Sequence, residues 1–207
     1  MKQNNTYIAI TGDVIHSRNT SESNFYILKE KLLEFNKKIN PVVPFSIQAG
    51  DEIQGLLNFG NKPLSNIIWF LGKLHPMKIR WGIGMGSLNS SIQQSSSNMR
   101  GSAFEYSRKA LIYAKKNKQL FAYSSSKNDI EQNNIILKLI SGIIDDWNIM
   151  AYRRCLLYFN TKTIYKVAES EGVSTEAINK HMNRTKIRLV LDSINYLDET
   201  VLGKSTL

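Results

Sequence analysis

Residues Phe45–Phe59 contain two short apolar stretches on either side of the turn-forming segment Ala49–Glu52. This pattern predicts a β-hairpin with an acidic turn, in which Gly50 supplies the positive φ angle that a tight turn requires. Asp51 and Glu52 then project from a rigid edge, where adjacent carboxylates repel each other unless a cation neutralises them. The alternative is an ordinary solvated turn, because Asp and Gly are common turn residues.

The segment Tyr7–Asp13 is another apolar run, which predicts a buried strand with Asp13 at its carboxyl end. Lys78–Gly86 predicts a further strand, whose three alternate glycines allow a neighbouring strand or a ligand to approach closely. Ser21 or Ser23 is expected to cap the first helix. The expected helices are 25–39, 66–73 and 100–114, and the expected last strand is 121–123. The order β-α-β-β-α-β-α-β is the ferredoxin-like scheme or its nucleotidyl cyclase-like elaboration, an α+β fold.

After residue 125 the apolar pattern is helical throughout. The polar segment Ser124–Asp129 predicts a domain boundary. We therefore expect three parts, namely a cyclase-like α/β domain at 1–125, a linker and connector helix at 126–146, and an all-α helix-turn-helix domain at 147–207. The helices expected after the boundary are 135–147, 149–159, 163–170 and a long final helix at 174–197.

The segment Thr161–Arg184 fits a helix-turn-helix, in which Gly172 takes the tight turn and Ser174 caps the second helix. The residues expected to point inward are Ile164, Val167, Ala168, Val173, Ala177, Ile178 and Met182. The residues expected to point outward and contact DNA are Thr175, Glu176, Asn179, Lys180, Asn183 and Arg184. Recognition helices of sigma-factor region 4, which this segment resembles, present base and phosphate contacts there. The alternative is a helical hairpin used for dimerisation or docking.

Charge and composition restrict the partners and the compartment. The formal net charge is +10, and residues 147–207 carry nine Lys or Arg against six Asp or Glu, which favours polyanionic partners such as nucleic acid or nucleotides. No apolar run approaches the roughly 18 residues of a membrane span, and the single Cys155 excludes a disulfide within the chain. We expect a cytoplasmic protein without membrane contact.

Asp13 and Asp51 form the first candidate site. If the strands that carry them pair, the two carboxylates converge at one edge of the sheet. Paired carboxylates at strand ends suit Mg²⁺ or Mn²⁺ that holds a nucleoside triphosphate. The alternative is two unrelated aspartates in turns.

Four segments, in chain order, resemble motifs of class III nucleotidyl cyclases and GGDEF diguanylate cyclases. They are Ile8–His16, Ala49–Ile53, Ile79–Gly86 and Gly101–Lys109. The whole chain, including its C-terminal helical region, resembles the SatD family of bacterial proteins. By the cyclase resemblance, Asp13 and Asp51 are metal ligands. The residues placed near a nucleotide are His16, Glu52, Glu105, Arg108 and Lys109.

Three positions depart from the cyclase pattern. The position of the base-contacting lysine is Ile47, and that of the ribose-positioning asparagine is Glu105. The arginine that stabilises the transition state falls on Lys109, with Arg108 beside it. A lysine is a point charge and does not reproduce the bidentate geometry of a guanidinium group. The resemblance therefore implies metal and phosphate binding rather than efficient cyclisation.

Three functional hypotheses follow from these observations. The first is a DNA-binding transcriptional regulator whose cyclase-like domain senses a nucleotide or metal ion or mediates dimerisation. The second is an active nucleotidyl cyclase or nucleotidyl transferase that its helical tail regulates, and the third is a scaffold with neither activity. The first two both imply a homodimer, because cyclase sites form between subunits and helix-turn-helix proteins usually read paired half-sites.

Overall fold

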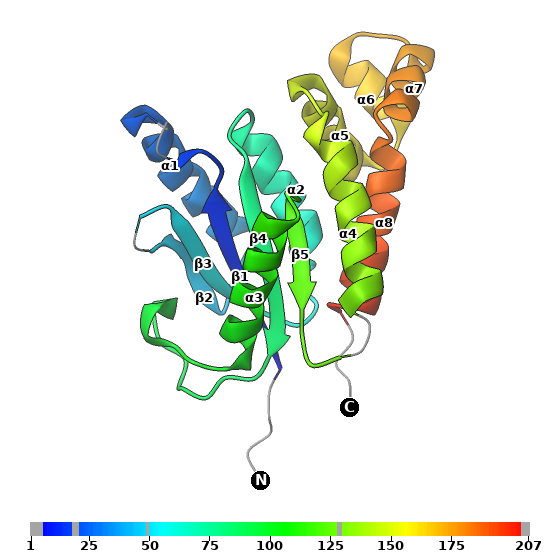
Figure 1. The fold of residues 1–207 in the computed structure, drawn as a ribbon. Coiled ribbons are helices and arrows are strands. Elements are labelled where there is room, and N and C mark those ends of the chain that lie inside the picture. Colours follow the sequence, from blue (N-terminus) through cyan, green and yellow to red (C-terminus); the bar gives the residue numbers. More distant parts are fainter. Residues whose placement is uncertain (1–5, 18–20, 49, 128–129, 204–207) are drawn as a thin grey trace.

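The predicted hairpin forms from β2 (Val43–Ile47) and β3 (Glu52–Asn58), which pair antiparallel, with Gly50 at a φ angle of 82°. The structure is a computed structural model that describes residues 6–17, 21–48, 50–127 and 130–203 (Figure 1). Ala49 of the predicted turn and residues 128–129 of the predicted linker therefore lie outside the described residues.

β1 lies at the centre of a five-stranded sheet with the order β2-β3-β1-β4-β5 (Figure 1). β1 is antiparallel to both β3 and β4, whereas β5 is parallel to β4. The elements are β1 (Tyr7–Val14), α1 (Glu22–Ile39), α2 (Pro63–Leu74), β4 (Ile79–Gly86), a 3-10 turn η2 (Ser96–Asn98), α3 (Ser102–Lys116) and β5 (Phe121–Ser124). Ser21 caps α1 by accepting a hydrogen bond from the Asn24 amide. The mixed α+β class and the predicted element order are confirmed.

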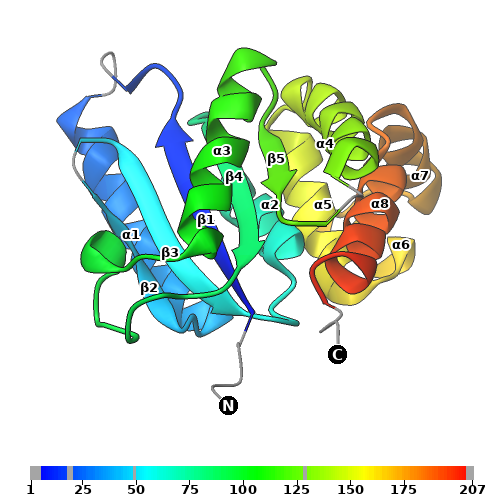
Figure 2. The same cartoon turned by 60° about the horizontal axis from the view of Figure 1, so that its bottom comes forward.

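The two faces of the sheet carry different layers (Figure 2). α1 and α2 cover one face, where Ile8 and Ile10 of β1 are fully buried. α3 covers the other face over β1, β4 and β5, where Ala9 is buried. Side chains alternate along a strand, so Thr11 and Asp13 lie on the same side as Ala9, facing α3.

Glycines of β4 bring α3 against the sheet. A Cβ atom at Gly82 would lie 2.1 Å from the backbone oxygen of Ser107, and one at Gly84 would lie 2.0 Å from the backbone nitrogen of Ser107. These distances are far below van der Waals contact. The alternate glycines were predicted to allow the close approach of a strand or a ligand, and they allow the close approach of a helix instead. The position of α3, and of every side chain that it carries, depends on this close approach.

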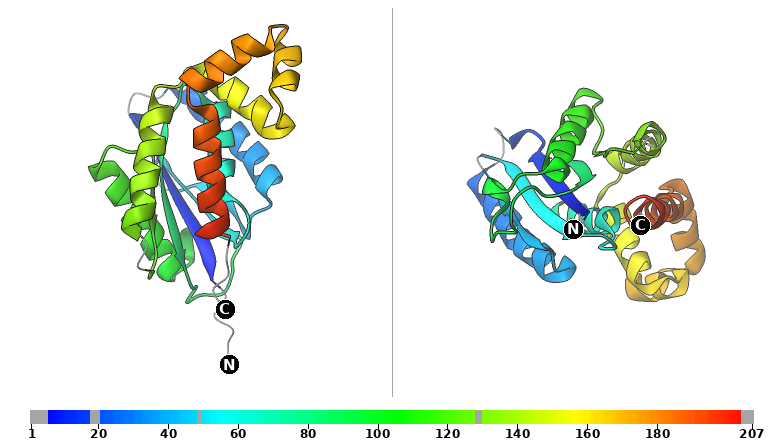
Figure 3. Two further views of the ribbon diagram at one scale, coloured as in Figure 1. Left: turned by 90° about the vertical axis from the view of Figure 1, so that its right-hand side faces the viewer. Right: turned by 90° about the horizontal axis from the view of Figure 1, so that it is seen from below.

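The C-terminal part of the chain is helical and packs on the α/β part (Figure 3). Its elements are α4 (Ile130–Asp145), α5 (Ile149–Thr161), α6 (Ile164–Glu171), α7 (Thr175–Arg184) and α8 (Ile187–Thr200). α4 contacts β5, and α8 contacts both α2 and α4. One continuous cluster of buried residues runs from Ile8 to Leu202 through both parts. Within the described residues, no helix has the length and apolar character needed to cross a membrane.

The predicted long final helix was wrong, because α7 and α8 are separate helices. Lys186 between them has a φ angle of 57°, which a continuous helix does not allow, and the Trp147 indole donates a 2.8 Å hydrogen bond to the freed carbonyl of Thr185. The break lets α8 turn back and pack on α2. Two predicted core residues were also wrong, since Val173 and Ala177 are exposed beside the turn.

A buried carboxylate joins α8 to α2. Lys62, which precedes α2, makes no side-chain cap, and Asp198 of α8 takes that place. Its oxygens accept hydrogen bonds from the backbone amides of Leu64 and Ser65, both at 2.9 Å, and from the Ser65 hydroxyl at 2.6 Å. Burial raises the pKa of Asp198, which is 1% exposed. The helical part thus supplies the N-cap of a helix in the α/β part.

Candidate functional site

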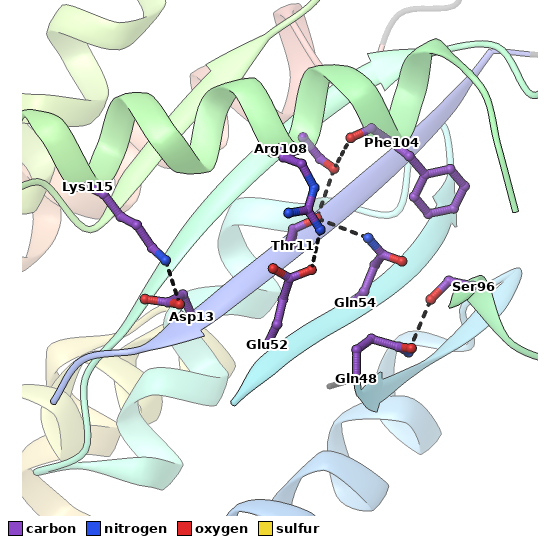
Figure 4. A network of polar contacts seen from close by, with 10 residues as sticks. Thr11, Asp13, Gln48, Glu52, Gln54, Ser96, Phe104, Arg108 and Lys115 are labelled. Carbon is purple, nitrogen blue, oxygen red and sulfur yellow. Dashed lines mark hydrogen bonds and ion pairs between the residues drawn. The ribbon is translucent and has the colours of Figure 1, made fainter. Parts of the chain in front are cut away.

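Polar side chains of β1 and β3 line up on the α3 side of the sheet (Figure 4). In the strand register, Asp13 lies directly opposite Glu52 on β3 and opposite Arg80 on β4. Thr11 lies opposite Gln54 in the same way. Cross-strand partners have their side chains on one face, so two strand pairings place these polar groups together. We call Thr11, Asp13, Glu52 and Gln54 the polar row.

Two cations of α3 neutralise the carboxylates of the polar row (Figure 4). The Lys115 Nζ atom lies 2.6 Å from Asp13 Oδ1, and an Arg108 guanidinium nitrogen lies 2.9 Å from Glu52 Oε1. The two carboxylates are only 17% and 22% exposed, whereas the cations are 44% and 62% exposed. Residues seven apart on a helix share a face, which is why both cations reach the same row.

A chain of hydroxyl groups fixes α3 over the polar row. The Ser107 hydroxyl donates to the Phe104 carbonyl at 2.9 Å, and it also lies 2.9 Å from the Thr11 hydroxyl. The Gln54 amide donates to Thr11 at 3.5 Å. Because Thr11 and Ser107 are fully buried, this chain sets the register of α3 on β1 and so places Arg108, the next residue, above Glu52.

Of the predicted metal ligands, Asp13 lies in β1 and Asp51 lies in the turn that precedes β3. The register pairs Asp13 with Glu52, and the partly exposed Asp51 precedes Glu52 in the turn. The part of the chain that the structure describes holds no group of three or more His, Cys, Asp or Glu side chains suited to a metal ion. Mg²⁺ or Mn²⁺ at Asp13 and Asp51 stays a prediction, and an ion there would compete with Lys115 for the Asp13 carboxylate.

Of the residues predicted near a nucleotide, Glu52 and Arg108 meet as an ion pair, but the others do not join them. Glu105 is exposed on α3. Lys109 lies over the ring of Tyr106, with its Nζ atom 5.4 Å from the ring centre. His16 is exposed at the end of β1 and lines a different cavity. The structure thus brings Glu52 and Arg108 together, and a nucleotide contact by these five residues stays a prediction.

Sequence reasoning missed Lys115, Arg80 and the contact between Thr11 and Ser107. Lys115 follows Arg108 by two helical turns, so helical periodicity alone places both on one face. Arg80 interrupts the apolar pattern of its strand and is the position opposite Asp13. No local pattern indicates that Thr11 meets Ser107, because 96 residues separate them in the chain.

Residues 164–184 form two helices, α6 and α7, with a short turn between them. The C-cap Gly172 has a φ angle of 65°, and the Ser174 hydroxyl accepts a 3.2 Å hydrogen bond from the Ala177 amide at the start of α7. The predicted inward residues Ile178 and Met182 are fully buried. α6 and α7 are thus joined by a three-residue connection, as in DNA-binding helix-turn-helix units.

The predicted DNA contacts lie on the outer side of α7. Thr175 is partly exposed, and the other five are exposed, namely Glu176, Asn179, Lys180, Asn183 and Arg184. The Arg188 guanidinium of α8 donates to the side-chain oxygens of Asn179 and Asn183, the latter at 2.7 Å. Sequence reasoning did not find this contact, because it requires the bend between α7 and α8.

A buried ion pair holds the helix-turn-helix on α5. Arg154, whose side chain is 12% exposed, contacts the 7% exposed Glu171 carboxylate at 2.8 Å. Burial, together with Arg154 and Arg184, lowers the pKa of His181 on α7. The His181 ring is therefore neutral at neutral pH, and the positive charge of α7 comes from Lys180 and Arg184.

Comparisons with solved structures give two distant similarities. The chain is 11% identical to a bacterial light-regulated adenylyl cyclase, with a TM-score of 0.44, over 57% of this chain and 75% of that chain. It is 12% identical to the catalytic core of a rhodopsin-guanylyl cyclase with converted specificity in complex with ATPαS, with a TM-score of 0.31, over 52% of this chain and 74% of that one. No curated protein matches the sequence.

The family comparison covers nearly the whole chain. The model of the SatD family matches residues 7–199, which include the sheet as well as α6 and α7. The chain therefore belongs to the SatD family.

Proposed function

We propose that this protein is a bacterial transcriptional regulator that contacts DNA through α7. In this proposal the α/β part binds a nucleotide or a metal ion, or holds two copies of the chain together. The observation that supports it best is the helix-turn-helix itself, with a short capped turn, two buried anchors and an exposed polar face on α7. A recognition helix needs this combination, because its inner face must hold it rigidly while its outer face enters the major groove.

The outer face of α7 has suitable chemistry for DNA. Lys180 and Arg184 are exposed, and neither forms an ion pair with another described residue. Arg188 engages the oxygens of Asn179 and Asn183, which leaves their amide N–H groups for acceptors on bases or phosphates. Two copies of α7 in a homodimer would contact two half-sites, which would offset the modest charge of one copy.

Arg184→Ala tests DNA binding by α7. We expect the variant to bind the selected DNA about 10-fold to 100-fold more weakly, because an arginine contact to a base or phosphate contributes about 1–3 kcal/mol. The salt dependence of binding should also become shallower by about one unit of log–log slope if Arg184 contacts a phosphate. Gel shifts with DNA selected from a random pool, and with the DNA upstream of the coding sequence, provide the measurement.

Lys37→Ala is the matched control, because Lys37 is an exposed residue near the end of α1 and the substitution removes the same charge. Its DNA affinity should equal that of the unmodified protein. An equal loss of affinity in both variants would mean that net charge, and not α7, determines binding. Absence of binding to all DNA tested would disprove the proposed function.

The second candidate, an active nucleotidyl cyclase or transferase, draws support from the register that sets Asp13 opposite Glu52. We expect no product from any of the four nucleoside triphosphates with Mg²⁺ or Mn²⁺, because Lys115 and Arg108 of α3 already neutralise the carboxylates of Asp13 and Glu52. Chromatography of the reaction mixtures is the measurement. A product that Asp51→Ala abolishes would establish the enzyme.

A further inference from the structure

A cleft of about 1030 Å³ lies at the end of the sheet where β1 stops and β4 begins. Its walls come from the start of α1, the ends of α2 and α3, and the second half of α4. None of Asp13, Asp51 and Glu52 lines it, but the cleft adjoins the polar row, because Lys115 lines the cleft and pairs with Asp13. Its size is that of cavities that enclose small-molecule ligands.

The cleft is lined by cations with almost no compensating acid. The six basic residues are Lys73, Lys78, Arg80, Lys115, Lys118 and Lys138, and Asp145 is the one carboxylate among the lining residues. Lys78 pairs with Asp145, and Lys115 pairs with Asp13 outside the cleft. Arg80, Lys118 and Lys138 form no ion pair with any described residue. A concave surface with charge of one sign concentrates the field and attracts oppositely charged ligands.

Favourable interaction with a helix dipole explains the positions of only some of these cations. Lys73 and Lys115 lie in the last turns of α2 and α3, where a cation interacts favourably with the helix dipole. Lys138 lies in the middle of α4, and Arg80 lies on a strand. The Arg80 Nε atom is buried and has no hydrogen-bond acceptor among the described residues. A buried donor without a partner is rare, and a ligand oxygen would satisfy it.

We propose that this cleft binds a ligand with two or more linked phosphate groups. Several cations converge on it, and their geometry suits a compact polyanion better than a single carboxylate. The cleft also has an apolar wall, formed by Ile15, Ile27, Leu74, Pro76 and Met77, which would pack against an attached base or sugar. Inorganic tripolyphosphate and a nucleoside triphosphate both carry linked phosphate groups. Only the nucleoside triphosphate has a base and a sugar that would pack against this wall.

The cleft is connected to the recognition helix. Lys78 pairs with Asp145 at the end of α4, and Trp147, two residues further along, donates a hydrogen bond to Thr185 at the end of α7. A phosphate that competes with Asp145 for Lys78 would act on the segment that holds α7. The ligand site stands independently of DNA binding, and only this regulatory consequence rests on the proposed function.

Isothermal titration with inorganic tripolyphosphate, ATP and GTP, at one ionic strength and without divalent cations, tests the site. Lys118→Gln and Lys138→Gln remove exposed charges that no described residue pairs with, so the fold should be unaffected. Each should weaken tripolyphosphate binding about fivefold, and the double variant more than 20-fold. Lys37→Gln, on α1 away from the cleft, should bind as the unmodified protein does. ATP or GTP binding tenfold tighter than tripolyphosphate would identify the ligand as a nucleotide.

Three results would overturn the site. Unchanged binding in the double variant would place the phosphates elsewhere. Sulfate binding as tight as that of tripolyphosphate would show general attraction of anions. Displacement of tripolyphosphate by a DNA duplex in the Arg184→Ala variant would assign the cleft to nucleic acid.

The regulatory consequence has its own measurement. Tripolyphosphate should change the DNA affinity of the unmodified protein about fivefold or more. Trp147→Phe, which cannot donate to Thr185, should reduce that change without altering tripolyphosphate affinity. Phosphate binding without any DNA binding would disprove the proposed function and leave the site standing. DNA binding that tripolyphosphate does not alter would disprove the connection.

Discussion

Gly84→Ala is expected to destabilise the protein by about 3 kcal/mol or more, which is a large fraction of the about 5–15 kcal/mol that stabilises a typical domain. The new Cβ atom would lie 2.0 Å from the Ser107 nitrogen and 2.3 Å from the Ala103 oxygen, which are backbone atoms of α3 that rotamer changes cannot move. α3 would have to lift from β4 and would carry Arg108 and Lys115 away from the polar row. Urea unfolding followed by tryptophan fluorescence measures the loss.

Gly142→Ala is the matched control for this prediction. Gly142 lies inside α4, and a Cβ atom there meets no neighbour within 4 Å. Alanine is the better helix former, so this variant should be as stable as the unmodified protein or more stable by up to about 1 kcal/mol. Equal urea midpoints for Gly84→Ala and Gly142→Ala would contradict the close approach of α3 to β4.

Asp198→Ala is expected to cost about 2–4 kcal/mol. The substitution leaves the amides of Leu64 and Ser65 and the Ser65 hydroxyl buried without an acceptor, and buried unpaired donors cost about 1–3 kcal/mol each before relaxation. It also opens a polar cavity between α8 and α2. The loss should appear in urea unfolding as a lower midpoint, with the first turn of α2 exchanging its amide hydrogens faster.

Two further substitutions distinguish the loss of the Asp198 cap from a general effect of removing a negative charge. Asp192→Ala removes an exposed carboxylate from the same helix and should change stability by less than about 0.5 kcal/mol. Asp198→Asn keeps one acceptor oxygen and avoids burying a charge, so it should cost less than Asp198→Ala. Equal losses for Asp192→Ala and Asp198→Ala would show that Asp198 does not cap α2.

Local patterns were sufficient to predict the strands and helices of the α/β part. The apolar run Tyr7–Asp13, the hairpin with Gly50 in its turn and the alternate glycines of β4 all depend on residues close together in the chain. The turn between α6 and α7 could be predicted for the same reason, since Gly172 and Ser174 act on their immediate neighbours. Local signals failed at Lys186, because Trp147, almost forty residues earlier, satisfies the carbonyl that the helix break frees.

In the candidate site, too, local patterns predicted single residues but not the contacts between them. Asp13 and Arg108 could be identified in the sequence as charged residues at a strand end and on a helix. Their partners could not, because the register of β1 on β3 and the seating of α3 on β4 decide which charges meet. The basic cleft had no sequence signal at all, since its cations come from α2, β4, α3, α4 and two connecting segments that only the packed structure brings together. Periodicity thus determined where each element lies along the chain, and long-range packing, through backbone contacts at Gly82 and Gly84 and the cap at Asp198, determined which side chains face one another.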